Sequence, residues 1–289
     1  MSIKTILVTG ANGQLGSEIK EQAKRSLHKF VFTDSNQLDI TNKAAVTSFF
    51  NKYSFDYIIN CAAYTAVDLA EEEREKAYAI NVLGVQYLAK EAKKQNATLI
   101  YISTDFVFNG EKNTPYTEED IPNPINYYGK TKYLGELAVQ KELKNHYIIR
   151  TSWLYGKQGN NFVKTMLKLA QKQQEISIVA NQYGTPTNAQ DLAMFILFLI
   201  NNKPLFGIYN FSNSSQQKTS WYDFANEIFK NSKITVSLRK NHKKHGVADR
   251  PKYSVLALEK TIALPYKLVD WKKSLKEYIK NNYEFRFKQ

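Results

Sequence analysis

The chain of 289 residues contains a single cysteine, Cys61, so it cannot form an internal disulfide bond. It also lacks a continuous apolar run of about 20 residues, the length that a membrane-spanning helix needs. The first residues lead directly into Ile6-Leu7-Val8 and a glycine-containing loop, without the basic, apolar and small-residue pattern of a secretory signal. Together these absences favour a cytoplasmic protein with no membrane partner.

Arginine is scarce as well, with 6 arginines against 34 lysines in a chain of net charge +13. Nucleic-acid recognition relies on arginine forks, whereas these lysines are spread along helical stretches beside asparagine and glutamine. We therefore expect a solvated surface and no nucleic-acid partner. The densest basic cluster, residues 239–245 (RKNHKKH), is expected to be a solvated loop, with attraction of an anionic substrate as the alternative. His242 and His245 are joined by no carboxylate or thiolate, so no metal site is expected.

Short apolar runs alternate with helical patterns through the first half of the chain. The predicted strands cover residues 6–9, 30–33, 57–61, 99–103 and 147–151, and the predicted helices cover 15–23, 43–52, 72–94 and 128–143. Near-continuous apolar strands between helices are typical of a parallel sheet that is covered on both faces. The pattern therefore predicts an α/β protein with a Rossmann-type doubly wound parallel sheet, whose ligands bind beyond the carboxyl ends of the strands.

In the second half, apolar runs and helical patterns alternate less regularly. Helices are predicted over residues 162–173, 191–201, 220–229 and 272–281, and strands over 176–179 and 207–211. We expect residues 1–151 to form the dinucleotide-binding domain, joined by parts of 176–200. Residues 152–289 would mainly form a smaller, interleaved substrate-binding domain above the carboxyl edge of the sheet.

A glycine-rich loop, TGANGQLG at residues 9–16, follows the first predicted strand and opens the first predicted helix. Glycines at this point permit a tight turn and a close approach of the backbone to a pyrophosphate, and the start of the helix adds free N–H groups. The loop predicts dinucleotide binding by Gly10, Asn12, Gly13, Gln14, Leu15 and Gly16.

An acidic residue ends the second predicted strand. Asp34 comes 18 residues after Gly16, where a carboxylate can accept hydrogen bonds from an adenosine ribose. Asp39 and Ile40 follow in the next loop, where they could flank the adenine. The alternative for Asp34 is a simple turn residue.

Tyr128 and Lys132 form a Tyr-x-x-x-Lys pair on one face of a predicted helix. A lysine ammonium close to a tyrosine would lower the pKa of the phenol and make it a usable proton donor near neutral pH. Chance alone predicts about two such pairs among 19 tyrosines and 34 lysines, so the position carries the argument. This pair is the only one in the sequence, and it opens the helix after the fourth predicted strand.

Ser103-Thr104-Asp105 follows the fourth predicted strand, at the edge of the sheet where a substrate would lie. A hydroxyl there can donate a hydrogen bond to a carbonyl that is being reduced. We expect Thr104 to have this role, with Ser103 as the second choice and a strand-end cap as the alternative.

These motifs together resemble the extended short-chain dehydrogenase/reductase superfamily and, within it, the dTDP-4-dehydrorhamnose reductase family. The resemblance covers almost the whole chain. It includes NCAAYTAVDLAE (60–71), STDFVFNG (103–110), YYGKTKYLGE (127–136), RTSWLYG (150–156), NNFVKTML (160–167), QYGTPT (182–187) and DRPKYSVL (249–256).

The resemblance implies further roles. Asp105 would support the catalytic set of Thr104, Tyr128 and Lys132, and Lys132 would also hold the nicotinamide ribose. The cofactor would be lined by Ala62, Ala63 and Tyr64, with Asn81 stabilising their loop. The substrate would be faced by Thr65, Val67, Phe106, Trp153 and Arg250. The family usually has tyrosine where this chain has Phe106, so one hydroxyl that could touch the sugar is missing. The alternative for Trp153 is a core aromatic, and for Arg250 a surface ion pair.

The implied reaction is reduction of the 4-keto group of dTDP-4-dehydro-L-rhamnose to dTDP-L-rhamnose. Residues 33–38 contain no lysine or arginine, which favours NADH beside Asp34, yet the resemblance implies that NADPH is also accepted. We therefore predict dual use of NAD(H) and NADP(H). The alternatives are a reductase or epimerase of another nucleotide-linked 4-keto-deoxysugar, and a non-catalytic regulatory subunit of the same fold. The sequence leaves the oligomeric state open, with a homodimer as one candidate.

Overall fold

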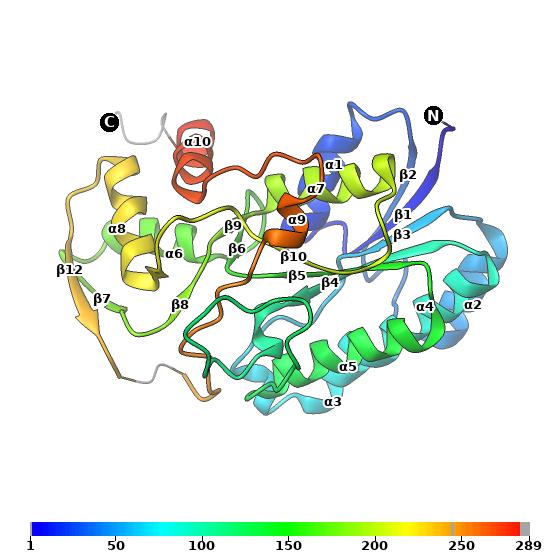
Figure 1. The fold of residues 1–289 in the computed structure, drawn as a ribbon, viewed down its shortest axis with the longest axis horizontal. Helices are drawn as coiled ribbons and strands as arrows, with labels where there is room; N and C mark the ends of the chain where they lie inside the picture. The colour runs from blue at the N-terminus through cyan, green and yellow to red at the C-terminus, as the bar shows by residue number, and fades with distance from the viewer. Residues whose placement is uncertain (1, 244–245, 284–289) are drawn as a thin grey trace.

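The fold is built on a six-stranded sheet, seen in a computed structural model that describes residues 2–243 and 246–283 (Figure 1). All neighbouring strands of this sheet are parallel. Their spatial order is β10 (Gly207–Phe211), β5 (His146–Thr151), β4 (Thr98–Thr104), β3 (Tyr57–Asn60), β1 (Thr5–Thr9) and β2 (Lys29–Thr33).

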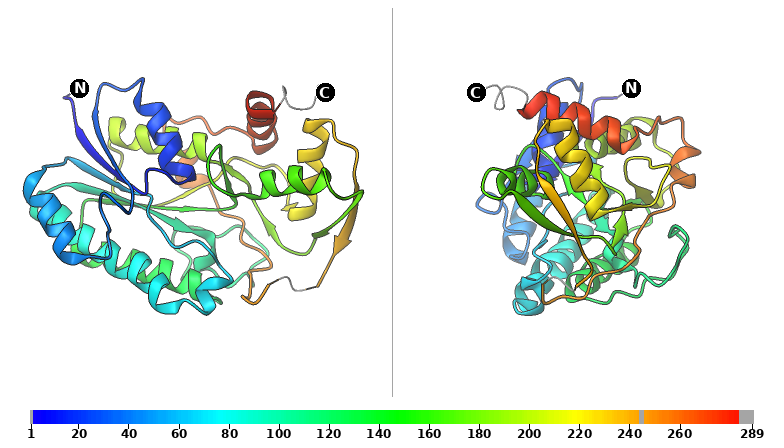
Figure 2. Two further views of the ribbon diagram at one scale, coloured as in Figure 1. Left: turned by 180° about the vertical axis from the view of Figure 1, so that it is seen from behind. Right: turned by 90° about the vertical axis from the view of Figure 1, so that its left-hand side faces the viewer.

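Both faces of the sheet are covered by helices, as the two views of Figure 2 show. Ile6 and Val8 of β1 pack with helices α1 (Gln14–Ala23) and α7 (Ala189–Asn202). Leu7, between them, points to the opposite face and packs with α2 (Lys43–Lys52), α4 (Val85–Lys94) and α5 (Tyr127–Glu142). Apolar side chains are therefore buried on both sides of one strand, and the predicted Rossmann-type doubly wound sheet is confirmed.

The single helix predicted over residues 72–94 is confirmed from Arg74 to Lys94, with one π-helical turn inside it. It consists of α3 (Arg74–Tyr78), the π-helical turn η2 (Ala79–Gly84) and α4. Asn81 in η2 accepts a hydrogen bond from the Tyr64 amide at 2.9 Å and donates to the Tyr64 carbonyl at 3.0 Å. The widened turn lets this buried side chain hold the loop after β3, and such turns are frequent at functional sites.

A smaller unit lies at one end of the sheet, at the left of Figure 1. Helices α6 (Phe162–Ala170), α8 (Trp221–Ser232) and α10 (Trp271–Tyr283) share an apolar core with β7 (Glu175–Val179). The prediction of a loop at 239–245 is wrong for its first part, because β12 (Ser237–Asn241) pairs in parallel with β7. Backbone pairing with β7 does not require alternating apolar residues, so the basic side chains of this segment gave no pattern that would predict a strand. Lys244 and His245 lie outside the described residues.

Short elements connect the two parts. They are η1 (Leu69–Glu71), η3 (Asp105–Val107), α9 (Glu259–Ile262), the parallel pair β6 (Leu154–Tyr155) and β9 (Thr187–Asn188), and the antiparallel pair β8 (Tyr183–Gly184) and β11 (Thr219–Ser220). The chain returns to the sheet after leaving it, since α7 and β10 both follow the first strands of the smaller unit. Within the described ranges, no helix has both the length and the apolar character that crossing a membrane requires.

Candidate active site

A cleft of about 660 Å³ lies at the carboxyl ends of the sheet strands. Ten of the residues predicted to bind cofactor or substrate, or to act in catalysis, line it together: Gly13, Gln14, Leu15, Ala63, Thr65, Thr104, Asp105, Tyr128, Lys132 and Trp153. The lining also includes Asn60, Cys61, Ser103 and Ser152. The cleft thus brings the glycine loop, the Tyr-x-x-x-Lys helix and the end of β4 around one space.

The glycine loop has no room for side chains at two of its positions. Gly10 has a φ of +63°, and a Cβ there would lie 2.6 Å from the Ala62 nitrogen. A Cβ on Gly16 would lie 2.4 Å from the Gly10 carbonyl oxygen, so helix α1 packs directly on the turn. Gly13 begins α1 without a side-chain cap, which leaves N–H groups of the first turn available at the cleft.

The predicted ribose and adenine residues lie around the end of β2. Asp34 accepts a hydrogen bond from the Asn12 amide at 2.8 Å through Oδ2, and two backbone N–H groups at 3.0 and 3.1 Å through Oδ1. Asp39 accepts from the Thr41 amide and hydroxyl, and Ile40 is buried against Gly84. Asp34 is therefore held in one orientation, with capacity left on Oδ2 for a further donor.

The loop after β3 is fixed from two sides. Asn81 bonds the backbone of Tyr64 and also donates to the Thr131 hydroxyl at 3.0 Å, while the Tyr64 hydroxyl donates to Glu73 at 2.9 Å. Thr65 faces the cleft, and Val67 is half-buried just before η1. These hydrogen bonds fix the path of the backbone that presents Ala63 and Thr65 to the cleft.

Tyr128 lies in the first turn of α5, which begins where Asn126 caps the Gly129 amide at 2.7 Å. Its side chain lines the cleft together with Thr104, and its ring packs edge-on against Phe106 with centroids 6.0 Å apart. Burial raises the pKa of Tyr128 to about 12, although the neighbouring Thr104 opposes the shift. The expectation that Lys132 lowers this pKa is wrong for this arrangement, and Tyr128 stays protonated at neutral pH.

The contacts of Lys132 explain why it does not lower the pKa of Tyr128. Its Nζ donates to the Ile102 carbonyl at 2.6 Å and lies 4.3 Å from the centre of the Tyr101 ring. Burial lowers the pKa of Lys132 to about 7, with the Glu136 carboxylate acting in the opposite direction. The ammonium is therefore directed at a carbonyl and is partly neutral near pH 7, so it does not stabilise a phenolate.

Ser103 and Thr104 differ in where their hydroxyls are committed. Ser103 Oγ donates to Glu136 at 2.5 Å, and Glu136 forms a buried ion pair with Arg150 at 2.7 Å. This side of β4 is therefore a closed polar network. Thr104 instead donates to Asp105 and lines the cleft with Tyr128, which favours Thr104 as the hydroxyl that faces a substrate.

Asp105 is buried behind Thr104, at 2% exposure. Its carboxylate accepts a hydrogen bond from Thr104 Oγ1 at 3.1 Å and from Ser254 Oγ at 2.5 Å. Burial raises the pKa of Asp105 to about 7, against the effect of these hydrogen bonds. Ser254 was not among the predicted site residues, although it belongs to the DRPKYSVL segment that also contains Arg250.

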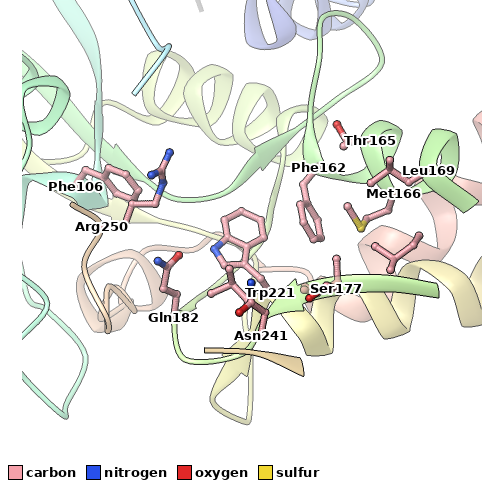
Figure 3. Close-up of a pocket in the computed structure, with 13 residues that line it drawn as sticks. Phe106, Phe162, Thr165, Met166, Leu169, Ser177, Gln182, Trp221, Asn241 and Arg250 are labelled. Carbon is pink, nitrogen blue, oxygen red and sulfur yellow. The ribbon is translucent and has the colours of Figure 1, made fainter. Parts of the chain in front are cut away.

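Two stacked tryptophans separate the cleft from a second pocket. Trp153 lines the cleft with a left-handed backbone (φ +46°), and its ring lies 3.6 Å from that of Trp221. Trp221 lines the second pocket, of about 320 Å³, together with the apolar Phe162, Met166 and Leu169 (Figure 3). A non-glycine residue in this conformation needs support from its surroundings. Trp221 supplies it, and sequence reasoning missed this residue.

Phe106 and Arg250 line the second pocket rather than the cleft (Figure 3). Arg250 is paired with Asp68, through Nη2 at 2.6 Å and Nη1 at 3.1 Å, and Nη1 also donates to the Ala248 carbonyl. Asp68 precedes η1, so the pair ties the C-terminal segment to the loop after β3. Arg250 thus forms an ion pair and lines a pocket at the same time.

A doubly wound parallel sheet with a glycine loop, and a Thr-Tyr-Lys set in the same cleft, define an NAD(P)-dependent oxidoreductase of the short-chain dehydrogenase/reductase type. The chain belongs to the RmlD substrate binding domain family, whose model matches residues 4–284.

Relatives with known names agree in sequence over most of the chain. Spore coat polysaccharide biosynthesis protein SpsK of Bacillus subtilis is 41% identical over 276 residues, which cover 95% of this chain and 96% of that protein. The dTDP-4-dehydrorhamnose reductase of Aggregatibacter actinomycetemcomitans is 42% identical over 230 residues, 78% of each chain.

Solved structures agree in fold. A crystal structure of a dTDP-4-dehydrorhamnose reductase from Clostridium acetobutylicum has a TM-score of 0.92 and 45% identity, covering 96% of this chain and 99% of that one. The dTDP-4-dehydrorhamnose reductase from Bacillus anthracis, solved in complex with NADP, also has a TM-score of 0.92, with 39% identity over 97% of this chain and all of that one.

Proposed function

We propose that the protein uses NAD(P)H to reduce the 4-keto group of dTDP-4-dehydro-L-rhamnose, forming dTDP-L-rhamnose for cell-surface polysaccharide biosynthesis. The observation that carries this proposal is the placement of Thr104, Tyr128 and Lys132 in one cleft with the glycine loop. Relatives with 40% identity or more, named as dTDP-4-dehydrorhamnose reductases, support the choice of substrate.

The chain fits a nicotinamide dinucleotide. Gly10 and Gly16 keep side chains out of the turn, and the uncapped start of α1 at Gly13 offers N–H groups and a positive dipole end to a pyrophosphate. Asp34 would accept from the adenosine ribose, and Lys132 would donate to the nicotinamide ribose. When bound, the dinucleotide supplies the hydride for the ketone carbon.

The reduction also needs a proton for the oxygen that becomes an alkoxide. Tyr128 keeps its phenolic proton at neutral pH because burial raises its pKa to about 12. It would give this proton to the alkoxide oxygen as the negative charge develops, while the Thr104 hydroxyl donates a hydrogen bond to the same oxygen. The remaining cleft residues orient the sugar and exclude water.

The nucleotide part of the substrate would lie beyond the sugar. Trp153 faces the cleft, and the pocket behind it combines apolar side chains with the polar Gln182, Asn241 and Arg250 (Figure 3). Such a pocket suits a thymine ring, with Arg250 turned to the diphosphate. A guanidinium can bind a phosphate oxygen in a charge-assisted hydrogen bond, so the diphosphate would share Arg250 with Asp68 or displace it.

Direct turnover tests the proposal against its alternatives. Purified protein mixed with dTDP-4-dehydro-L-rhamnose should consume NADPH and NADH, measured by absorbance, and should release dTDP-L-rhamnose. An epimerase would return its hydride and leave the absorbance unchanged. A regulatory subunit would bind partners without turnover. If the protein consumes NAD(P)H only with a different nucleotide-linked 4-keto-deoxysugar, the proposed substrate is wrong but the proposed ketone reduction holds.

We place the reaction in the cytoplasm, where reduced nicotinamide cofactors are maintained. The nucleotide-sugar and the dinucleotide are the ligands proposed for the cleft. The absence of nucleic-acid binding stays a prediction, as does a homodimer. The described residues contain no group of three or more His, Cys, Asp or Glu side chains arranged to hold a metal ion.

A further inference from the structure

A second line of hydrogen bonds runs behind the catalytic hydroxyls, away from the cleft. Thr104 Oγ1 lies 3.1 Å from Asp105 Oδ1, and the other carboxyl oxygen, Oδ2, accepts from Ser254 Oγ at 2.5 Å. Ser254 is itself 2% exposed, and its amide donates to the Tyr183 carbonyl at 2.8 Å. The three side chains join β4, η3 and the C-terminal segment in one buried chain, and its Thr104 end lines the same cleft as Tyr128.

The Thr104 hydroxyl has one proton, which it can donate in one direction at a time. When Asp105 is ionised, its carboxylate accepts this proton, and the proton points away from the ketone. When Asp105 is neutral and its proton is on Oδ1, the carboxyl donates to Thr104 instead. Thr104 is then free to donate its own proton to the ketone oxygen. The charge on Asp105 therefore decides whether Thr104 can assist the reduction.

We propose that Ser254 is a positioning residue for this reduction, because its hydrogen bond to Oδ2 directs the proton of a neutral Asp105 carboxyl to Oδ1, from where it orients Thr104. The inference rests on the proposed function. Atoms balance without a further proton source, since Tyr128 supplies the proton to the alkoxide and Asp105 keeps its own throughout the step. Ser254 acts through Asp105 and Thr104 and touches no reacting atom.

The surroundings of Asp105 suit a carboxyl that is neutral for part of the time at physiological pH. Burial raises its pKa to about 7, although the hydrogen bonds from Ser254, from Thr104 and from the backbone favour the charged form. In the described structure, Tyr128 of α5 is the titratable side chain whose charge is coupled to that of Asp105. Thr104 of β4 and Ser254 of the C-terminal segment, which also face it, do not titrate.

The test compares Ser254→Ala with Ser254→Thr, which keeps the hydroxyl, and with Asp105→Asn. Ser254→Ala should lower kcat about three- to tenfold with little change in KM, and the alkaline fall in kcat should move up by about one pH unit, because the pKa of Asp105 rises. Ser254→Thr should restore both. In Asp105→Asn, the amide can donate to Thr104 and accept from Ser254. The part of the fall near pH 7 that belongs to Asp105 should disappear, and the titration that remains should be that of Lys132, whose pKa burial lowers to about 7.

A second readout keeps this inference separate from the choice of substrate. Infrared titration of the Asp105 carboxyl, taken as the difference between wild type and Asp105→Asn, needs no turnover. The apparent pKa should lie near 7 and should rise in Ser254→Ala, with thermal unfolding used to confirm that each variant is folded. A wild type that consumes no NAD(P)H would refute the proposed function alone.

Three outcomes would overturn the role of Ser254. One is a Ser254→Ala enzyme with the wild-type kcat and pH profile, and another is an Asp105 carboxyl that ionises well below pH 6 or does not respond to Ser254→Ala. The third is an Asp105→Asn enzyme that loses activity at every pH, because the charged carboxylate would then be the working form.

Discussion

Replacing Tyr128 with phenylalanine removes the proposed proton donor and leaves the rest of the cleft in place. The ring would keep its edge-on packing against Phe106, and Thr104 would keep its contacts with Asp105 and the Phe106 amide. The substitution removes one hydroxyl group, so the free energy of unfolding should fall by no more than about 1 kcal/mol. Loss of general acid catalysis lowers rates by about 10²- to 10⁴-fold, or about 3–5 kcal/mol on the barrier. Catalysis should therefore suffer far more than stability.

The assay is NADPH consumption with saturating dTDP-4-dehydro-L-rhamnose, together with NADPH binding measured by fluorescence. We expect kcat to fall at least about 100-fold in Tyr128→Phe, with cofactor affinity nearly unchanged. Tyr127→Phe is the matched control, because it changes the neighbouring residue of the same helix turn, whose ring contacts Arg74 outside the cleft. Near-normal turnover in Tyr128→Phe would refute the assignment, whatever the control shows.

Three further substitutions test separate parts of the site. Lys132→Met should lower kcat and weaken NAD(P)H binding together, because we propose that Lys132 supports catalysis and also binds the nicotinamide ribose. If only one of these quantities changes, the role that corresponds to the other is wrong. Arg250→Ala should raise KM about 30-fold or more with NAD(P)H affinity unchanged, as expected for a lost charged hydrogen bond to the diphosphate. Asp68→Asn should raise KM less than Arg250→Ala does. Equal increases in KM would mean that Arg250 acts through its ion pair with Asp68 and does not bind the diphosphate. We expect wild-type NADPH and NADH use to agree within about tenfold, and Asp34→Ala to shift the kcat/KM ratio toward NADPH. An unmoved ratio would mean that Asp34 does not touch the ribose.

The six strands of the sheet were predictable because each is an apolar run between helical patterns, and a buried parallel sheet requires such runs, whereas their spatial order was not predicted. The π-helical turn at Asn81 was not predictable from periodicity, because the hydrogen bonds of Asn81 are made with Tyr64, which lies outside the helix. Strand β12 was missed for a related reason. Its residues are basic and its pairing is with β7, more than 50 residues earlier, so only the backbone of the folded chain reveals it.

The catalytic set could be predicted from position, whereas its electrostatics could not. A Tyr-x-x-x-Lys spacing places two side chains on one helix face, but it does not say that Lys132 will donate to the Ile102 carbonyl instead. The second contact of Arg250, with Asp68, and the contact of Ser254 with Asp105 each join residues about 150 to 180 positions apart. The motif DRPKYSVL pointed to this segment, but its geometry appears only in three dimensions.

The return of the chain to the sheet has a consequence for biosynthesis. Helix α7 covers one face of β1 and its neighbours, and β10 is the outer strand beside β5, yet both are made after residue 188. A nascent chain that has emerged only as far as β5 therefore exposes the part of the apolar face that α7 covers, together with an unpaired strand edge, which is a template for wrong pairing. The dinucleotide-binding half cannot complete its folding on the ribosome until more than 200 residues have emerged. A fragment cut at residue 151 should aggregate rather than bind NAD(P)H.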